Sequence, residues 1–496
     1  MRRSFATVVV LGTFAAVMAP VSASAASAPH YRGANTAAVQ DDFNGDGYRD
    51  LAVGAPSAAN GKVEGAGAAV VLYGSASGVR ASSKRTVITQ QTSGVPGAAE
   101  AWDGFGATTA SADLDGDGYA DLVVGVPDEA VGAAAGRGTV TVIWGGPSGL
   151  KGAATISVPA GYSRGRDDCG FGGSLAVGDM NGDGHPELAV GSRCEGVLYT
   201  GPFTRAGKAA AVRSEFSTGE SRGAVMGDVN GDHKAELFWL PGNTYGNSRG
   251  DIYIDNAPLT GDVIISTGIH LPLGHGYEGQ VGDINGDGYG DLVTGAPDDE
   301  FGPTGPNDAH IGGEIEVLYG GKNGITASQA PHIYSQDTAK VPGAGEKGDG
   351  FGYALSVGDT NGDHYADVLV GAPFEGIGRA RWAGQATLLF GSASGLTGNK
   401  SVAYNQNTAN VPGAAETDDS FGGAVDLRDV NKDGKADVFV GVPGEGNSGC
   451  VWIARGAATP VTKGSVNLGG GTAGATSISA GQWGFGAAFN SPHAAQ

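Results

Sequence analysis

Short hydrophobic runs recur along the chain, and each is bounded by glycine or proline. DLAVGAP (50–56) and DVLVGAP (367–373) end in a Gly-x-Pro turn, whereas VVLYGSASG (70–78) and TLLFGSASG (387–395) are closed by glycines. Runs of about four to eight residues between such turn signals are typical of β-strands. Because long helix-period stretches are absent outside the N-terminus, the pattern predicts an all-β fold.

An acidic segment of nine residues, with the pattern D-x-[ND]-x-D-x-x-x-[DE], recurs between these runs. Seven copies, numbered loops 1 to 7, occupy residues 42–50, 113–121, 179–187, 228–236, 283–291, 359–367 and 429–437. Their starts lie 71, 66, 49, 55, 76 and 70 residues apart, a period typical of a solenoid or a propeller. With four short strands per unit, the repeats predict a seven-bladed β-propeller in which each acidic loop joins the first and second strands of a blade.

The dipeptide Phe-Gly stands before several of the loops, as in FGGSLAVGD (171–179) and FGYALSVGD (351–359). Its lead-in occurs as three near copies, VPGAAEAWDGFG, VPGAGEKGDGFG and VPGAAETDDSFG, which end at Gly106, Gly352 and Gly422. Together with the acidic loop and the Gly-Ala-Pro turn, Phe-Gly resembles the signature of FG-GAP repeats in integrin α-subunits. The resemblance covers residues 34–489. It implies an integrin-like propeller of the kind found in secreted bacterial proteins.

Some units depart from the signature. Blade 4 (221–242) lacks both Phe-Gly and the Gly-x-Pro turn, and blades 1 and 5 lack Phe-Gly. An orphan WGFGAAF (483–489) stands near the C-terminus with no loop after it. We expect this strand to pair with the N-terminal blade and close the ring, which would remove two exposed sheet edges. A frayed terminus is the alternative.

Each loop offers side-chain oxygens at positions 1, 3, 5 and 9 and a backbone carbonyl near position 7. These are hard ligands, which suit Ca²⁺ or Mg²⁺ better than zinc or copper. An EF-hand would need a bidentate glutamate at position 12, which is uncharged here. Plain turns would not need three or four acids in nine residues, whose repulsion a cation relieves. We therefore predict about five to seven Ca²⁺ ions per chain.

The candidate ligands are the residues at positions 1, 3, 5, 7 and 9, where position 7 contributes its carbonyl. They are Asp42, Asn44, Asp46, Tyr48, Asp50, Asp113, Asp115, Asp117, Tyr119, Asp121, Asp179, Asn181, Asp183, His185, Glu187, Asp228, Asn230, Asp232, Lys234, Glu236, Asp283, Asn285, Asp287, Tyr289, Asp291, Asp359, Asn361, Asp363, Tyr365, Asp367, Asp429, Asn431, Asp433, Lys435 and Asp437. Glycine usually stands at position 6, where the turn requires a positive φ. His233 and His364 replace it in loops 4 and 6, so the occupancy of these two loops stays open.

The net charge of −22 narrows the choice of partners. It argues against nucleic acid, whose phosphates such a surface would repel, and against an anionic membrane surface. The 91 glycines and 22 prolines fit the turns of an all-β protein.

Residues 1–25 are predicted to be a signal peptide. Arg2 and Arg3 precede an apolar run from Phe5 to Val21, and cleavage is expected near residues 25–28. A membrane anchor is the alternative, but the run is short and no second apolar segment of spanning length follows. We therefore expect a secreted protein, exported by either the Sec or the twin-arginine route.

Three cysteines occur, without a CxxC motif. Cys169 stands at the start of the first strand of blade 3 and Cys194 just past the end of the second. Because these two strands are expected to be antiparallel, the pair is predicted to form a disulfide. Cys450 is left as the odd thiol.

The connections on the face opposite the acidic loops are candidates for ligand binding. The richest in polar and aromatic side chains are residues 298–311 and 374–384. Arg379, Arg381 and Trp382 combine hydrogen-bond donors with a stacking surface, which suits a carboxylate or a sugar. The alternative is that these side chains are solvated loop tips.

Two short motifs receive structural interpretations. Arg249-Gly250-Asp251 matches a tripeptide that some integrins recognise, but Gly250 opens the third strand of its repeat. GYSRG (161–165) has the letters of a nucleophile elbow, yet it lacks the required strand before it and helix after it. No catalytic constellation is found, so we do not expect an enzyme.

We therefore expect a non-enzymatic, monomeric scaffold for adhesion or for binding an extracellular protein or glycan. Two alternatives stay open. One is an extracellular hydrolase or accessory protein, because FG-GAP propellers also resemble the C-terminal part of glycosylphosphatidylinositol phospholipase D. That family's catalytic domain precedes the propeller, and only a short stretch separates the predicted signal from blade 1 here. The other is a passive component of the cell wall or matrix.

Overall fold

The computed structural model describes most of the predicted propeller. It covers residues 39–297, 311–458, 462–474 and 484–489, with gaps at 133, 160–161, 163–167, 217–222, 241–242, 245–247, 250, 256–258, 260–262, 265–268 and 273. The predicted signal peptide and most of the 298–311 connection lie outside the described residues, as do Gly250 of the Arg-Gly-Asp tripeptide and most of GYSRG. None of the described helices is long and apolar enough to cross a membrane.

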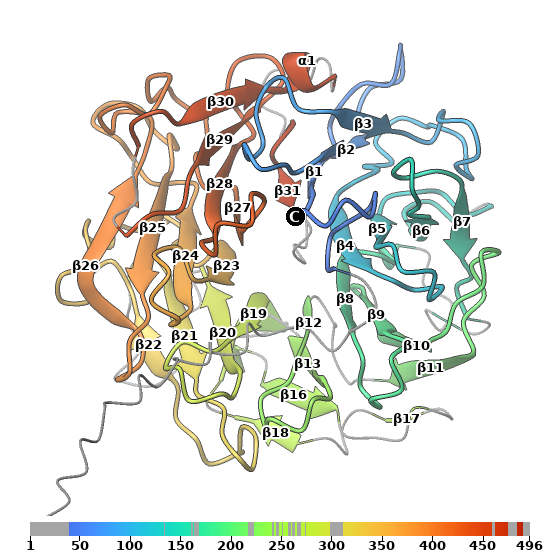
Figure 1. Cartoon of the computed structure of the whole chain (residues 1–496), viewed down its shortest axis with the longest axis horizontal. Helices are drawn as coiled ribbons and strands as arrows, with labels where there is room; N and C mark the ends of the chain where they lie inside the picture. Colours follow the sequence, from blue (N-terminus) through green and yellow to red (C-terminus); the bar gives the residue numbers. More distant parts are fainter. Residues whose placement is uncertain are drawn as a thin grey trace, which may run out of the picture.

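Seven antiparallel sheets form the blades of a ring (Figure 1). They are blade 1, with β31 (Ala488–Phe489), β1 (Leu51–Ala55), β2 (Ala68–Leu72) and β3 (Arg85–Ile88); blade 2, with β4 (Thr108–Ala112), β5 (Asp121–Val126), β6 (Thr139–Ile143) and β7 (Ala153–Ile156); blade 3, with β8 (Ser174–Gly178), β9 (Glu187–Gly191), β10 (Gly196–Thr200), β11 (Ala211–Phe216) and the added parallel strand β17 (Val263–Ile264); blade 4, with β12 (Gly223–Gly227), β13 (Glu236–Leu240), β16 (Ile252–Asp255) and β18 (Ile269–Leu271); blade 5, with β19 (Glu278–Gly282), β20 (Asp291–Ala296), β21 (Glu314–Leu318) and β22 (His332–Tyr334); blade 6, with β23 (Ala354–Gly358), β24 (Asp367–Ala372), β25 (Gln385–Phe390) and β26 (Thr397–Tyr404); and blade 7, with β27 (Ala424–Arg428), β28 (Asp437–Val442), β29 (Cys450–Ala454) and β30 (Val466–Gly469). A small hairpin, β14 (Asn243–Thr244) with β15 (Ser248–Arg249), and a one-turn helix, α1 (Gly470–Ala473), complete the described elements. The prediction of an all-β, seven-bladed propeller is confirmed.

The first strand of each blade lies innermost. In ring order these strands are β31, β4, β8, β12, β19, β23 and β27, and each contacts the next. Second strands such as β1 and β28 are buried along their whole length because they are covered by the neighbouring blades. The hydrophobic core is therefore divided into clusters, most of which combine side chains from two adjacent blades.

The strand at residues 488–489 completes the first blade. β31 pairs antiparallel with β1, with Val53 opposite Phe489 and Gly54 opposite Ala488. Its other side faces blade 2, where the hydroxyl of Thr109 donates to the carbonyl oxygen of Phe489 at 2.8 Å. Figure 1 shows the two ends of the described chain meeting at this point. Blade 1 is thus assembled from both ends of the chain.

The Phe-Gly and Gly-x-Pro signatures meet at the interfaces between blades. At the start of blade 6, the buried Phe351 donates its backbone N–H to Gly312 of blade 5 at 2.7 Å. The next residue, Gly352, donates to Gly371 of its own blade at 3.1 Å. Its carbonyl oxygen lies so close to Gly295 of blade 5 that a Cβ there would collide with it. Glycine is therefore required because two backbones touch.

Blade 4 is held by different contacts. The indole ring of Trp239 in β13 lies over Gly196 of blade 3 and fills the space that a side chain there would need. Arg213 of β11 and Asp255 of β16 form an ion pair across the same interface, and both are buried. Large side chains and a buried ion pair stand here in place of the repeat signature.

Candidate metal centres

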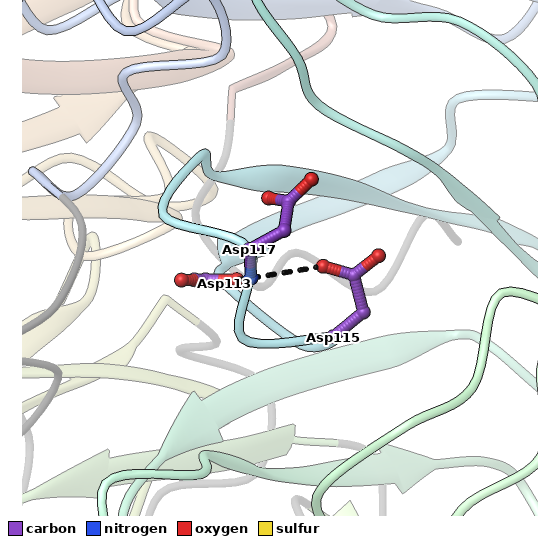
Figure 2. Close-up of side chains that lie close together, drawn as sticks. All are labelled: Asp113, Asp115 and Asp117. Carbon is purple, nitrogen blue, oxygen red and sulfur yellow. Dashed lines mark hydrogen bonds between the residues drawn. The ribbon is translucent and has the colours of Figure 1, made fainter.

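In blades 2 to 7 the acidic loop joins the first and second strands, as predicted, whereas loop 1 directly precedes β1, whose inner neighbour β31 comes from the other end of the chain. All seven loops share one hydrogen-bond skeleton. In loop 2, the carboxylate of Asp113 accepts the backbone N–H of Asp117 at 3.0 Å and that of Gly118 at 2.9 Å. Asp115 accepts a second bond from the N–H of Asp117 at 3.2 Å (Figure 2). The chain is thus wrapped around its first carboxylate, which directs the side chains at positions 1, 3 and 5 toward one another.

Loop 2 has a carboxylate at each of positions 1, 3 and 5. One oxygen from each of Asp113, Asp115 and Asp117 lies within 4.8 Å of the other two. Ligand oxygens that surround Ca²⁺ at about 2.3–2.6 Å are separated by comparable distances. The loop therefore brings its acidic ligands close enough to share one ion.

The carboxyl group at position 9 is held more deeply. In loop 2, Asp121 accepts the N–H of Leu114 at 2.9 Å and that of Gly145 at 2.8 Å, and its side chain is buried. Burial, together with the nearby Asp115 and Asp113, raises its pKa to about 8. A buried carboxylate beside other carboxylates favours either a proton or a cation.

The same cause acts in the other six loops. Burial is the main reason why the pKa of the position 9 carboxyl is raised in each of them. It rises to about 8 for Asp50, to about 7 for Glu187, Glu236, Asp291 and Asp367, and to about 6 for Asp437.

Loops 4 and 6 keep the common conformation although histidine replaces glycine at position 6. His233 and His364 adopt φ values of 67° and 72°, in the left-handed region. The N–H of His364 donates to Asp359 at 2.8 Å, as the glycine N–H does in loop 2. Position 4 also has a positive φ, for example 74° at Gly116, and this requirement was missed in the sequence. In all seven loops the backbone N–H at position 6 donates to the carboxylate at position 1, so the loops share one backbone conformation.

Arg205, which the sequence pattern did not single out, lies against loop 2. Its guanidinium donates to Asp115 at 2.6 Å and also contacts Asp117. It comes from the connection between β10 and β11 in blade 3. An arginine in this place neutralises part of the charge of loop 2 and would compete with a cation for the same oxygens.

A cavity of about 350 Å³ lies where the innermost strands meet. At its wall Arg428 contacts Asp41 at 3.3 Å and Asp426 at 3.1 Å, and Arg49 contacts Asp41 at 2.7 Å. Burial alone would raise the pKa of Asp41, but the two guanidinium groups bring it below its usual value. The charges here are paired with one another, and the network links the segment before β1 to β27 of blade 7.

Cys169 and Cys194 are bonded in the structure. Their Cα atoms are 5.3 Å apart, and the N–H of Arg193 donates to the carbonyl of Cys169 at 2.9 Å. Both cysteines lie at the end of blade 3 opposite its acidic loop. Cys450 is a buried free thiol in β29.

The three candidate ligand-binding residues lie on the connection between β24 and β25. Trp382 is 49% exposed, its ring meets that of Phe374 edge-on at 6.4 Å, and the guanidinium of Arg381 lies 5.3 Å from its centre. Arg379 is exposed on the same connection. The structure thus brings Arg381 and Trp382 together on the face opposite the acidic loops.

Comparison with known proteins places the repeats in a family. The FG-GAP repeat model matches residues 34–72, 105–143, 171–202, 275–311, 351–389 and 421–453. The stretch that includes loop 4 is outside these matches, in agreement with the departures of blade 4.

Two kinds of curated relative are found. Mouse integrin alpha-7 is 32% identical over 148 residues, 29% of this chain and 11% of that protein. Human phosphatidylinositol-glycan-specific phospholipase D is 35% identical over 153 residues, 30% of this chain and 17% of that protein. The chain therefore spans less than a fifth of the length of either relative. Among solved structures, the Dos1 propeller shares 12% identity over 68% of each chain, with a TM-score of 0.37. The chain is an FG-GAP repeat protein with an integrin-like β-propeller.

Proposed function

We propose that the protein is a secreted, calcium-stabilised propeller that binds an extracellular protein or glycan without catalysing a reaction. The acidic loops carry the proposal. Each loop places carboxylates around one turn, and its carboxyl at position 9 loses hydration through burial, which disfavours the charged form unless a cation is near. Calcium accepts six to eight such oxygens in flexible loops, whereas magnesium requires stricter geometry.

The proposed number of ions is about five to seven. Loops 4 and 6 share the geometry of the others, which supports the upper end of this range. Arg205 at loop 2 supports the lower end. At about tenfold excess of calcium over Kd, each independent site would stabilise the fold by about 1.4 kcal/mol.

The ligand would bind on the opposite face, around Arg381 and Trp382. An exposed indole ring stacks on the apolar face of a sugar or on an aromatic side chain, and the adjacent guanidinium binds carboxylates. A rigid ring is well suited to present such loops.

Removal of calcium tests the proposal directly. Protein freed of metal over a chelating resin should melt many degrees below the calcium-loaded form, and metal analysis of the loaded form should give about five to seven ions. Equal melting temperatures would mean that the loops are only turns. Binding to a glycan array, with Trp382→Ala and Arg381→Ala as variants, then separates a ligand-binding scaffold from a passive wall component.

An enzymatic role is the second candidate, because the phospholipase D similarity favours it. A hydrolase screen of the purified protein with and without EDTA would detect it. Activity that copurifies with the chain would replace the scaffold proposal.

A further inference from the structure

Two tryptophans are exposed on the face opposite the acidic loops. The side chain of Trp102 is 47% exposed and that of Trp382 is 49% exposed, whereas the other tryptophans that the structure describes are buried. Trp102 stands on the connection from blade 1 to blade 2, and Trp382 on the connection between β24 and β25 of blade 6. Both indole rings are therefore presented by loops of one face.

Trp102 stands on the segment that leads into the next blade. Its backbone N–H donates to the carbonyl of Glu64 in blade 1 at 3.1 Å. At the boundary of blades 6 and 7, the N–H of Asp418 donates to the carbonyl of Arg381 at 3.0 Å in the same way. Trp102 therefore has the place in the repeat that Asp418 has at the other boundary.

Trp382 stands on the facing segment of its boundary. Its carbonyl accepts the N–H of Ser420 at 3.0 Å, as the carbonyl of Gly65 accepts that of Gly104 at 3.1 Å. Trp382 thus has the place of Gly65. The ring of Trp102 lies over Gly65, where it would collide with a Cβ. Two different sequence positions therefore bring an indole ring to the same place in the repeat.

The backbone at both positions favours glycine. The φ angle is 70° at Trp102 and 53° at Trp382, in the left-handed region. Other copies of the repeat have Gly348 at the first position, with φ of 86°, and Gly65 or Gly136 at the second, with φ of 63° and 67°. A bulky residue is strained in this conformation, and such strain is typical of functional sites. The fold itself therefore gives no reason for a half-exposed tryptophan at either position.

Charged groups stand beside each ring. The exposed Glu64 is the backbone partner of Trp102, while Arg381 and Asp418 lie next to Trp382. The core of a protein interface is apolar and depleted of charge, which single rings among charges do not provide. A pyranose ring, in contrast, has an apolar face that stacks on an indole and hydroxyls that bond to carboxylates and guanidinium groups. The surroundings of both rings favour a carbohydrate.

The boundary of blades 7 and 1 lies between the two rings in ring order. There Phe485 donates to Ser448 at 2.9 Å, as Phe421 donates to the residue after Trp382, so the preceding Asn447 has the place of Trp382. Asn447 is exposed, and its amide offers both donors and an acceptor. Because packed sheets are about 10 Å apart, the two rings are separated by more than one sugar residue.

We propose that Trp102, Asn447 and Trp382, called the tryptophan arc, bind a neutral polysaccharide, with a sugar stacked on each ring. The inference rests on the proposed function, because it names the ligand class for the face that carries Trp382 and adds a second contact point. A chain held at both rings binds more tightly than at either, because the second contact is intramolecular. The net charge of −22 would repel an anionic chain.

Glycine variants test the tryptophan arc without straining the fold. Trp102→Gly and Trp382→Gly give each position the residue that other copies of the repeat have there. Both variants should therefore melt within about 2 °C of the wild type in calcium. Val466→Thr is the matched control, because it removes exposed apolar surface from the outer strand of blade 7.

Affinity electrophoresis in gels that contain hydroxyethylcellulose, galactomannan or mixed-linkage β-glucan measures binding. For the polymer that retards the wild type, each tryptophan variant should lose about 100-fold or more in affinity, and the control none. The carboxymethylated form of that polymer should bind more weakly. If no neutral polymer retards the wild type, the inference is wrong and only a protein ligand is left for the proposed function. A loss in Trp382→Gly alone would refute two-point binding but keep the proposed site at Trp382.

A second measurement uses only the wild-type chain. N-bromosuccinimide oxidises exposed indole rings, and peptide mapping locates the oxidised residues. The retarding polysaccharide should protect both Trp102 and Trp382 from oxidation. Protection of one ring, or of neither, would overturn the inference.

Discussion

Blades 4 and 6 have the same strand order but are joined to their neighbours in different ways. In blade 6, Ala354 stands opposite Gly371, and a Cβ at Gly371 would collide with the carbonyl oxygen of Gly422 in blade 7. In blade 4 the glycine is on the other strand: Gly223 stands opposite Leu240, and it is Gly223 that lies against the backbone of Tyr277 in blade 5.

The comparison separates what the repeat requires from what it usually contains. Each of these interfaces needs one position without a side chain where the next blade's backbone approaches. In blades with the signature this glycine stands on the second strand, whereas in blade 4 it stands on the first. The space released on the second strand of blade 4 is filled by Leu240, and Trp239 packs toward blade 3. Loss of the signature therefore does not mean loss of the blade.

Both blades have an acidic loop, and removing calcium from these loops should have the largest effect on stability. Glu236 in blade 4 and Asp367 in blade 6 both have a pKa of about 7, above the value of an unfolded carboxyl. A pKa that is higher in the folded than in the unfolded protein means that the protonated carboxyl stabilises the fold. In metal-free protein this stabilisation is complete below about pH 4 and is lost as the pH rises through about 6 to 8. The melting temperature should fall by several degrees or more over that window.

Saturating calcium should abolish this fall, because the cation replaces the proton on the buried carboxyl. Differential scanning calorimetry of resin-treated protein with and without CaCl₂ measures both slopes. A metal-free protein that becomes more stable from about pH 6 to about pH 8 would contradict the assignment.

The ion pair between blades 3 and 4 is expected to have the next largest effect. Arg213→Met removes the charge while keeping much of the length, and it leaves the buried Asp255 without its guanidinium. Breaking a buried pair in this way costs about 3–5 kcal/mol. Denaturant unfolding in calcium measures the loss, and Arg213→Met/Asp255→Leu should recover a large part of it. If Arg213→Met is as stable as the wild type, blade 4 does not depend on this ion pair.

The glycine contact between blades 6 and 7 should have a somewhat smaller effect. Gly371→Ala places a methyl group against the carbonyl of Gly422, which the strands relieve only by separating. We expect a loss of about 2–4 kcal/mol. Gly376→Ala is the matched control, because it lies on the following connection with open space around it. Equal unfolding midpoints for the two variants would remove the steric explanation of the signature.

Much of the fold could be predicted because the repeat marks both ends of the second strand in most blades. The acidic loop precedes it and the Gly-x-Pro turn follows it, so strands such as β24 could be placed within a residue or two. Blade 4 could be recognised only through its loop, since Trp239 and Arg213 act through neighbours that are distant in sequence. The extra strand β17 carries no local signal, because two residues paired with another blade's edge look like any loop.

The candidate metal sites could be predicted only in part. The spacing of acids within nine residues determined the loop ligands, because a loop that folds around its first carboxylate needs no distant partner. Arg205 was missed, since it meets Asp115 only when the connection between β10 and β11 lies beside loop 2.

The pairing of β31 with β1 has a consequence for how the protein matures. A chain that emerges from its N-terminus can build blades 2 to 7 in order, each on the last, but blade 1 waits for residues 488–489 to arrive. Until then β1 presents an open edge, and the propeller is a split ring. Contacts that join residues so far apart in sequence form slowly. The period before closure is therefore when the chain is most exposed to proteolysis and to pairing with another copy of itself.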